Sequence, residues 1–155
     1  MCAAAGEGMA HGETRRETEE RRSETDAAHG ASAADVLRAI PPWQRSSGRA
    51  ELLAFALRTR RAPERDGIWL AGAACYGQSP ATFFPKSNNP RSEEHRRAYA
   101  FCERCPVVEE CLLDALAFSD RGGVRGFTLE TERRKIRRLL GGPPPYARPP
   151  SVDER

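Results

Sequence analysis

The residues of this sequence best suited to metal or redox chemistry are its cysteines. Four of them lie in the central part of the chain: Cys75, Cys102, Cys105 and Cys111. Two residues separate Cys102 from Cys105, a spacing that lets both thiolates reach one metal centre, and Cys111 and a loop cysteine, Cys75, complete the set. Four thiolates on a mainly helical frame hold an iron–sulfur cluster or a zinc ion. Structural zinc sites usually present two such close pairs and this chain has one, so the spacing favours the cluster.

Other interpretations of the same cysteines stay open. In one interpretation they are buried side chains that pack as small hydrophobes. In another they bind zinc or a cluster that only stabilises a protein interaction module and has no sensing role. Cys102 and Cys105 are also the pair that a protein disulfide reductase would use, although no βαβ pattern surrounds them. We expect Cys2 to be exposed and no ligand, and His95 to be an exposed helix residue that binds no metal. The sequence has no Ser/His/Asp set and no phosphate-binding loop, so we predict that it is not an enzyme.

The composition limits which folds can position the cysteines. The chain has 155 residues, of which 39% are hydrophobic and 30% charged, which excludes a large barrel or a doubly wound sheet. It has no run of about twenty apolar residues and no signal-peptide pattern, so we expect a cytoplasmic protein with no membrane partner. Cysteines stay reduced in that compartment, which again favours metal chemistry over structural disulfides.

The distribution of apolar residues separates a structured region, 36–140, from two tails. Residues 1–35 contain no Val, Ile, Leu, Phe, Trp or Tyr, and we predict a disordered N-terminal arm. Within the structured region we expect a helical N-terminal extension over 36–66 and, from the family resemblance described below, an iron–sulfur domain over 67–140. Glycines and prolines dominate residues 141–155, which predicts a second disordered tail.

Hydrophobic periodicity predicts helices and no convincing strand. The expected helices cover 32–38, 48–61, 93–104, a segment that starts at Pro106 and ends before Gly122, and 129–140. Ser92 and Thr128 are the expected caps of the third and the fifth. The predicted fold class is therefore all-α, a small domain of four to five short helices built around a four-Cys iron–sulfur cluster.

The last predicted helix is the candidate nucleic-acid contact. It places five cations within six positions: Arg133, Arg134, Lys135, Arg137 and Arg138. Such a cluster neutralises several phosphates of DNA, although a solvated helix face explains it nearly as well.

Further motifs flank the cysteines in a fixed order. Trp69 stands six residues before Cys75, and Pro80 and the segment Thr82–Pro85 follow it. The later motifs are Cys102-Glu-Arg-Cys-Pro-Val, Cys111-Leu-Leu-Asp-Ala-Leu, Gly123-Val-Arg-Gly-Phe and Leu129-Glu-Thr-Glu-Arg-Arg. With this order the chain resembles, from Trp69 through Leu140, the WhiB-like family, the iron–sulfur transcription regulators of actinobacteria.

The resemblance implies a transcriptional regulator with one [4Fe-4S] cluster per chain, bound by Cys75, Cys102, Cys105 and Cys111. It implies a response to oxygen or nitric oxide through that cluster. We expect cluster loss to be the switch, with the freed thiols pairing as disulfides in the apo form.

The resemblance also implies two partners. One is DNA, contacted by the basic C-terminal helix, and the other is region 4 of the primary sigma factor of RNA polymerase. The expected partner-binding turn consists of Gly123, Val124, Arg125, Gly126 and Phe127. Arg125 stands where the family has tryptophan, and Phe127 where it has glycine.

Overall fold

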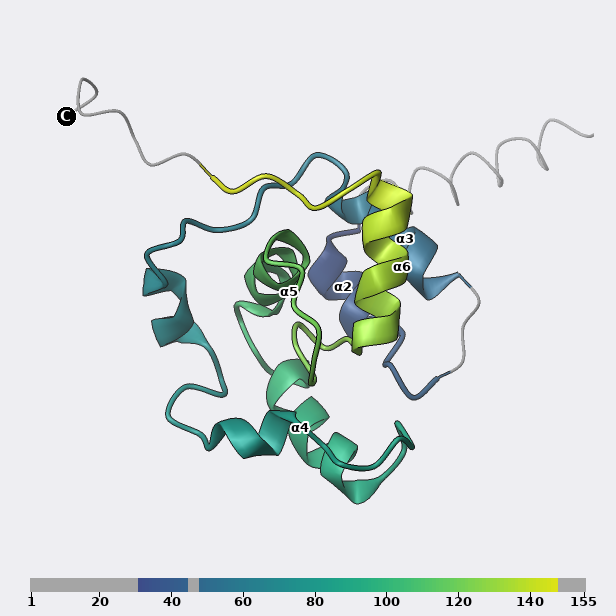
Figure 1. The fold of residues 1–155 in the computed structure, drawn as a ribbon, viewed down its shortest axis with the longest axis vertical. Helices are drawn as coiled ribbons and strands as arrows, with labels where there is room; N and C mark the ends of the chain where they lie inside the picture. The colour runs from purple at the N-terminus through teal and green to yellow at the C-terminus, as the bar shows by residue number, and fades with distance from the viewer. Residues whose placement is uncertain (1–30, 45–47, 148–155) are drawn as a thin grey trace, which may run out of the picture. The chain divides into compact units, whose positions relative to one another are not determined.

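The computed structural model describes residues 31–44 and 48–147. Predictions for residues 1–30, including Cys2, and for 45–47 and 148–155 lie outside the described residues. The described part contains five α-helices and no named strand: α2 (Ala33–Ala39), α3 (Arg49–Leu57), α4 (Glu93–Glu103), α5 (Val108–Ala117) and α6 (Glu130–Leu140). Two 3-10 helices, η1 (Ile68–Gly72) and η2 (Pro80–Phe83), interrupt the connection between α3 and α4. The all-α prediction is confirmed for this part of the chain (Figure 1).

The first two described helices pack against each other, and the second packs against the last. Ser32 and Asp35 form a reciprocal capping box that starts α2 before the predicted end of the arm at residue 35. Leu53 and Leu57 of α3 and Ile136 of α6 are fully buried, and α3 lies alongside α6 (Figure 1). The helix predicted over 48–61 ends at Leu57, because the polar residues that follow have no apolar surface to bury.

Helix α5 is the central element of the part that contains the four cysteines. Its Val108, Leu112, Ala115 and Leu116 are buried, and the helix contacts both α2 and α6. The long connection from α3 to α4 passes along the other side of α5 (Figure 1). None of the described helices is long and apolar enough to cross a membrane.

The segment after α6 returns to the connection that follows α3. The Ala62 N–H donates to the Pro145 carbonyl oxygen over 2.9 Å, and the Ala147 N–H donates to the Ala62 carbonyl oxygen over 2.8 Å. The Arg65 guanidinium lies 4.4 Å from the centre of the Tyr146 ring. Residues 62 and 146 thus form a parallel bridge, and the tail predicted to be disordered from residue 141 keeps defined contacts as far as Ala147.

Candidate metal centre

Four cysteines from four segments of the chain line one cavity. They are Cys75 after η1, Cys102 near the end of α4, Cys105 between α4 and α5, and Cys111 in α5. Apart from these sulfurs the lining is apolar: Trp69, Leu70, Ala73, Phe101, Val108 and Gly126. All four thiols are free, and in the described residues no three His, Cys, Asp or Glu side chains converge tightly enough to hold a single metal ion.

A tight turn between two helices sets the spacing of Cys102 and Cys105. Helix α4 ends at Glu103, and the Cys105 N–H donates to the Cys102 carbonyl oxygen over 3.2 Å. Helix α5 begins at Val108, later than the predicted start at Pro106, because Cys105 and Pro106 belong to this turn. The Cys111 N–H then donates to the Val107 carbonyl oxygen, which places Cys111 in the first turns of α5.

Backbone N–H groups point at three of the four sulfurs. The Ala74 N–H donates to Cys105 Sγ over 3.5 Å. The N–H groups of Gly126 and Phe127 donate to the sulfurs of Cys111 and Cys102. Such donors stabilise the thiolate form and compensate the negative charge of a thiolate-ligated metal centre.

Burial opposes ionisation of these thiols. It raises the pKa of Cys102 to about 12, although the Phe127 N–H acts in the opposite direction. Burial also raises the pKa of Cys75 and of Cys111, and for Cys75 the neighbouring Cys105 adds to the effect. The thiols of Cys75, Cys102 and Cys111 therefore keep their protons at neutral pH unless a metal replaces them.

The turn Gly123–Phe127 is fixed against the centre by close backbone packing. Gly126 has φ +54°, and a Cβ there would lie 2.5 Å from the Leu112 Cα. Gly123 has φ +60°, and a Cβ there would lie 2.4 Å from the Phe83 carbonyl oxygen. The Val124 N–H donates to that same oxygen over 2.8 Å. Only glycine fits both positions, so the turn is wedged between η2 and α5.

The five residues expected to bind a partner differ in exposure. Val124, Gly126 and Phe127 are buried. Phe127 packs edge-on against Trp43 and Tyr99, with ring centres 5.9 and 5.8 Å away. Only Gly123 and Arg125 of the turn are left to present surface to a partner.

The basic residues of α6 do not share one face. Arg133 is 0% exposed and donates to the carbonyl oxygens of Thr128, Gly122 and Gly123 over 3.0, 2.7 and 3.2 Å. The expectation that Arg133 contacts DNA is therefore wrong, because its guanidinium satisfies carbonyl groups inside the domain. Thr128 is not the predicted side-chain cap of α6, since its hydroxyl donates to the Arg125 carbonyl oxygen over 2.7 Å.

The other basic residues of α6 lie nearer the surface. Arg134 pairs with Glu130 over 2.6 Å, and Lys135 pairs with Glu51 of α3 over 2.7 Å. Arg138 is exposed, and Arg137 is half-buried. The remaining candidate phosphate contacts are therefore Arg134, Lys135, Arg137 and Arg138.

Two buried polar residues depart from what their types predict. His95 is 6% exposed, with its Nδ1 2.9 Å from Ser92 Oγ and its ring 5.8 Å from that of Tyr99, so the expected exposed histidine is wrong. Burial lowers its pKa. Arg49, which the sequence did not single out, is 3% exposed and donates to the Phe127 carbonyl oxygen over 2.9 Å.

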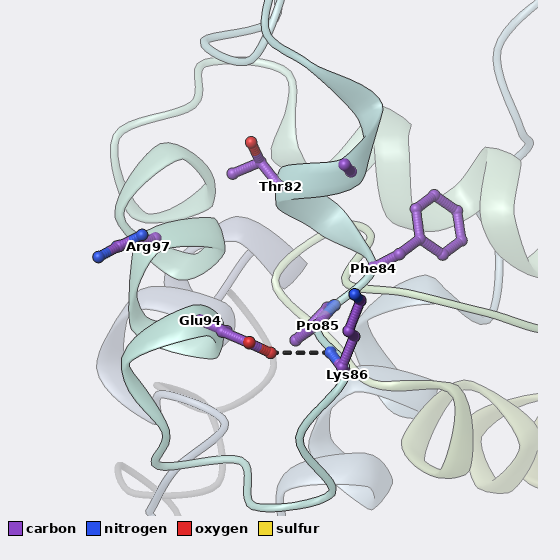
Figure 2. Close-up of a pocket in the computed structure, with 7 residues that line it drawn as sticks. Thr82, Phe84, Pro85, Lys86, Glu94 and Arg97 are labelled. Carbon is purple, nitrogen blue, oxygen red and sulfur yellow. Dashed lines mark hydrogen bonds between the residues drawn. The ribbon is translucent and has the colours of Figure 1, made fainter.

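A separate pocket of about 240 Å³ lies between η2 and α4 and contains none of the predicted site residues. Figure 2 shows Glu94 pointing across it to the backbone N–H of Lys86, which donates to the carboxylate over 2.8 Å. A second N–H, that of Ser87, donates to the same oxygen over 3.2 Å, and these bonds lower the pKa of Glu94. This carboxylate fixes the loop after the Phe-Phe-Pro motif.

The fold and the site together define a small helical protein with a four-cysteine centre. The model of the family described as "Transcription factor WhiB" matches residues 69–136. The transcriptional regulator WhiB1 of Mycobacterium tuberculosis is 39% identical over 71 residues, which cover 45% of this chain and 84% of that protein. Transcriptional regulator WhiB2 of the same species is 37% identical over 76 residues, 49% of this chain and 81% of that protein.

A relative from another organism gives a similar result. Transcriptional regulator WhiB1 of Bifidobacterium longum is 38% identical over 71 residues, which cover 45% of this chain and 77% of that protein. No solved structure gives a significant match. The chain belongs to the WhiB family. The matched relatives are named as transcriptional regulators and not as enzymes.

Proposed function

We propose that this protein is a cytoplasmic transcriptional regulator that holds one [4Fe-4S] cluster on Cys75, Cys102, Cys105 and Cys111. Loss of the cluster to oxygen or nitric oxide is the switch in this proposal. The observation that carries it is the single apolar cavity that all four thiols line. Membership of a family whose matched relatives are named transcriptional regulators supports the regulatory role.

The donor set fits such a cluster. Four soft thiolates are the ligands that iron–sulfur clusters take from proteins. The N–H groups of Ala74, Gly126 and Phe127 meet three of the sulfurs and would offset the negative charge of the loaded site. Trp69 and Phe101 line the cavity and would limit the access of water. When bound, the cluster would supply a centre that exchanges electrons and reacts with oxygen or nitric oxide.

The same contacts explain how cluster loss would change the protein. Cys75 belongs to the loop after η1, and the other three ligands belong to α4, α5 and the turn that joins them. Without a shared centre, that loop loses its link through Cys75 to the other three cysteines. With oxygen as the acceptor of two electrons and two protons, a pair of the freed thiols then forms a disulfide, and Cys102 and Cys105 are the nearest in sequence. The turn that donates to Cys102 and Cys111 would lose two of its contacts and change its exposed surface.

The proposed partners are DNA and region 4 of the primary sigma factor. Arg134, Lys135, Arg137 and Arg138 of α6 are the proposed phosphate contacts. Gly123 and Arg125 are the surface that the turn offers to the sigma factor.

A second candidate is an interaction module in which zinc or a cluster only staples the fold. The four-thiolate set favours it, because structural zinc sites use the same ligands. A disulfide reductase is disfavoured, because burial raises the pKa of Cys102 and suppresses the thiolate such an enzyme needs.

The proposal is tested with loaded protein, nitric-oxide-treated protein and four single Cys→Ser variants at the ligand positions. Cys2→Ser is the matched control. Binding to a promoter-length duplex and to purified sigma region 4 is measured with thermal stability. We expect nitric oxide and each ligand substitution to change binding and lower stability, and Cys2→Ser to change neither. Equal partner binding and equal stability of loaded and treated protein would overturn the sensing role.

A further inference from the structure

Arg125 lies in the turn beside the centre and is held in place by two carboxylates. Its Nη1 donates to Asp120 Oδ2 over 2.9 Å, and its Nη2 donates to Asp114 Oδ2 over 3.0 Å. Asp114 follows Cys111 by three residues on α5, so the two side chains share a helix face. The backbone of Arg125 is also fixed, because its N–H donates to the Thr128 carbonyl oxygen and its own carbonyl oxygen accepts from the Thr128 N–H. The guanidinium therefore has one defined position.

This position lies beside the proposed metal centre. Arg125 directly precedes Gly126, which lines the cavity of the four thiols, and its partner Asp114 lies one helical turn after Cys111. Burial raises the pKa of the Cys111 thiol, and the charge of Arg125 acts in the opposite direction. The Arg125 side chain is 28% exposed, so water screens its charge only in part.

We propose that Arg125 positions the Cys111 thiolate and compensates the charge of the cluster, which raises the reduction potential of the cluster. The inference rests on the proposed function. A one-electron reduction places one more negative charge on the cluster and its thiolates, and a fixed cation beside one thiolate stabilises the reduced state more than the oxidised state. Asp114 and Asp120 hold the cation and moderate its charge. The family pattern has tryptophan at this place, so the tuning belongs to this chain.

The same ion pairs have a purely structural explanation, in which Arg125 braces α5 against the loop that follows it. That role predicts a loss of stability when the pairs are removed and no effect on the cluster. The reduction potential of the cluster separates the two roles, because a purely structural role of Arg125 leaves that potential unchanged.

The test uses the full chain loaded with its cluster under anaerobic conditions. The variants are Arg125→Gln, Arg125→Lys and, as matched control, Arg121→Gln, which removes an exposed charge from the same loop. The cluster accepts one electron from a low-potential mediator dye, and the visible spectrum follows the titration. We expect Arg125→Gln to lower the equilibrium constant for reduction about tenfold, or 59 mV for one electron. Arg125→Lys retains most of the potential, and Arg121→Gln leaves it unchanged.

A further variant, expected to shift the reduction potential in the opposite direction, is used in case Arg125→Gln does not take up the cluster. Asp120→Asn removes one counter-charge and leaves the arginine, so we expect it to raise the potential. If Arg125→Gln has the reduction potential of the wild type, the role of Arg125 is overturned and the proposed function still stands. If Arg125→Gln does not take up the cluster, a wild-type potential in Asp120→Asn has the same consequence. A wild-type chain that takes up no iron or sulfide overturns the proposed function, and this inference with it.

Discussion

The Arg49 guanidinium in α3 donates to the carbonyl oxygen of Phe127 over 2.9 Å, and the N–H of the same Phe127 donates to the Cys102 sulfur. Arg49 also bonds to the Glu132 carboxylate of α6 and to the Ile40 carbonyl oxygen. Helix α3 precedes residue 69, where the family match begins. A single residue, Phe127, therefore links this helix to a proposed metal ligand. The extension and the part that contains the four cysteines share one core.

Replacing Arg49 by methionine should destabilise the domain by about 3 kcal/mol, because a carboxylate and two carbonyl oxygens lose a buried donor. The matched control is Lys135→Met, which removes another ion pair between α3 and α6. The Lys135 and Glu51 side chains of that pair are 42% and 47% exposed, so the loss of stability should be small. Equilibrium urea unfolding measures both, and equal losses would contradict the role assigned to Arg49.

Gly126→Ala should cost about 3 kcal/mol and reduce metal loading. The new Cβ would lie 2.5 Å from Leu112 at a φ of +54°, so the turn must move away from α5 and from Cys111. Gly141→Ala is the control, since Gly141 has φ +79° with nothing within 4 Å of its Cβ position. That substitution should cost only about 1 kcal/mol and leave the metal content unchanged. Normal loading of Gly126→Ala would show that the turn is not part of the site.

The double variant Arg134→Ala with Arg138→Ala should weaken DNA binding at low salt. Each lost phosphate contact lowers the salt dependence of binding by about one in slope, so the double variant should lower it by about two. Arg133→Met should instead destabilise the fold, because three carbonyl oxygens lose their donor. Fluorescence anisotropy on a short duplex at several salt concentrations checks this. Unchanged affinity and slope in the double variant exclude Arg134 and Arg138 as phosphate contacts.

The stability of the domain should fall below pH 6.5 because of His95. Burial lowers its pKa from the ordinary value of 6.5, although the Glu94 carboxylate acts in the opposite direction. As the pH drops below 6.5, the unfolded chain binds a proton that the folded chain binds only at lower pH, so stability is lost over that interval. His95→Gln should show a smaller decline between pH 7 and 5.5 in thermal unfolding. Parallel declines in both proteins would exclude His95 as the source.

Local patterns were sufficient to predict much of the helical frame. Ser92 caps α4 as predicted, and the apolar spacing of Leu112 and Leu116 predicts the buried face of α5. The four cysteines could be grouped from spacing and from the order of the flanking motifs. These features depend on residues close together in sequence, which is why they can be predicted without a structure.

The wrong predictions have a common physical origin. Arg133 was expected to contact DNA and Arg49 was not singled out, but carbonyl oxygens of the Gly122–Thr128 segment hold both inside. His95 is buried beside Tyr99. The contact of Ala62 with Pro145 joins residues far apart in the chain. Each depends on partners that only the tertiary structure brings together, and no local pattern signals them.

Metal analysis of the anaerobically purified wild-type protein tests the central claim most directly. Iron, sulfide and zinc are assayed on one sample whose visible spectrum is recorded first. The proposal predicts a brown protein with a thiolate-to-iron absorption band, iron and sulfide in equal amounts, and no stoichiometric zinc. A colourless protein with one zinc per chain would contradict it and leave the four cysteines as a structural staple.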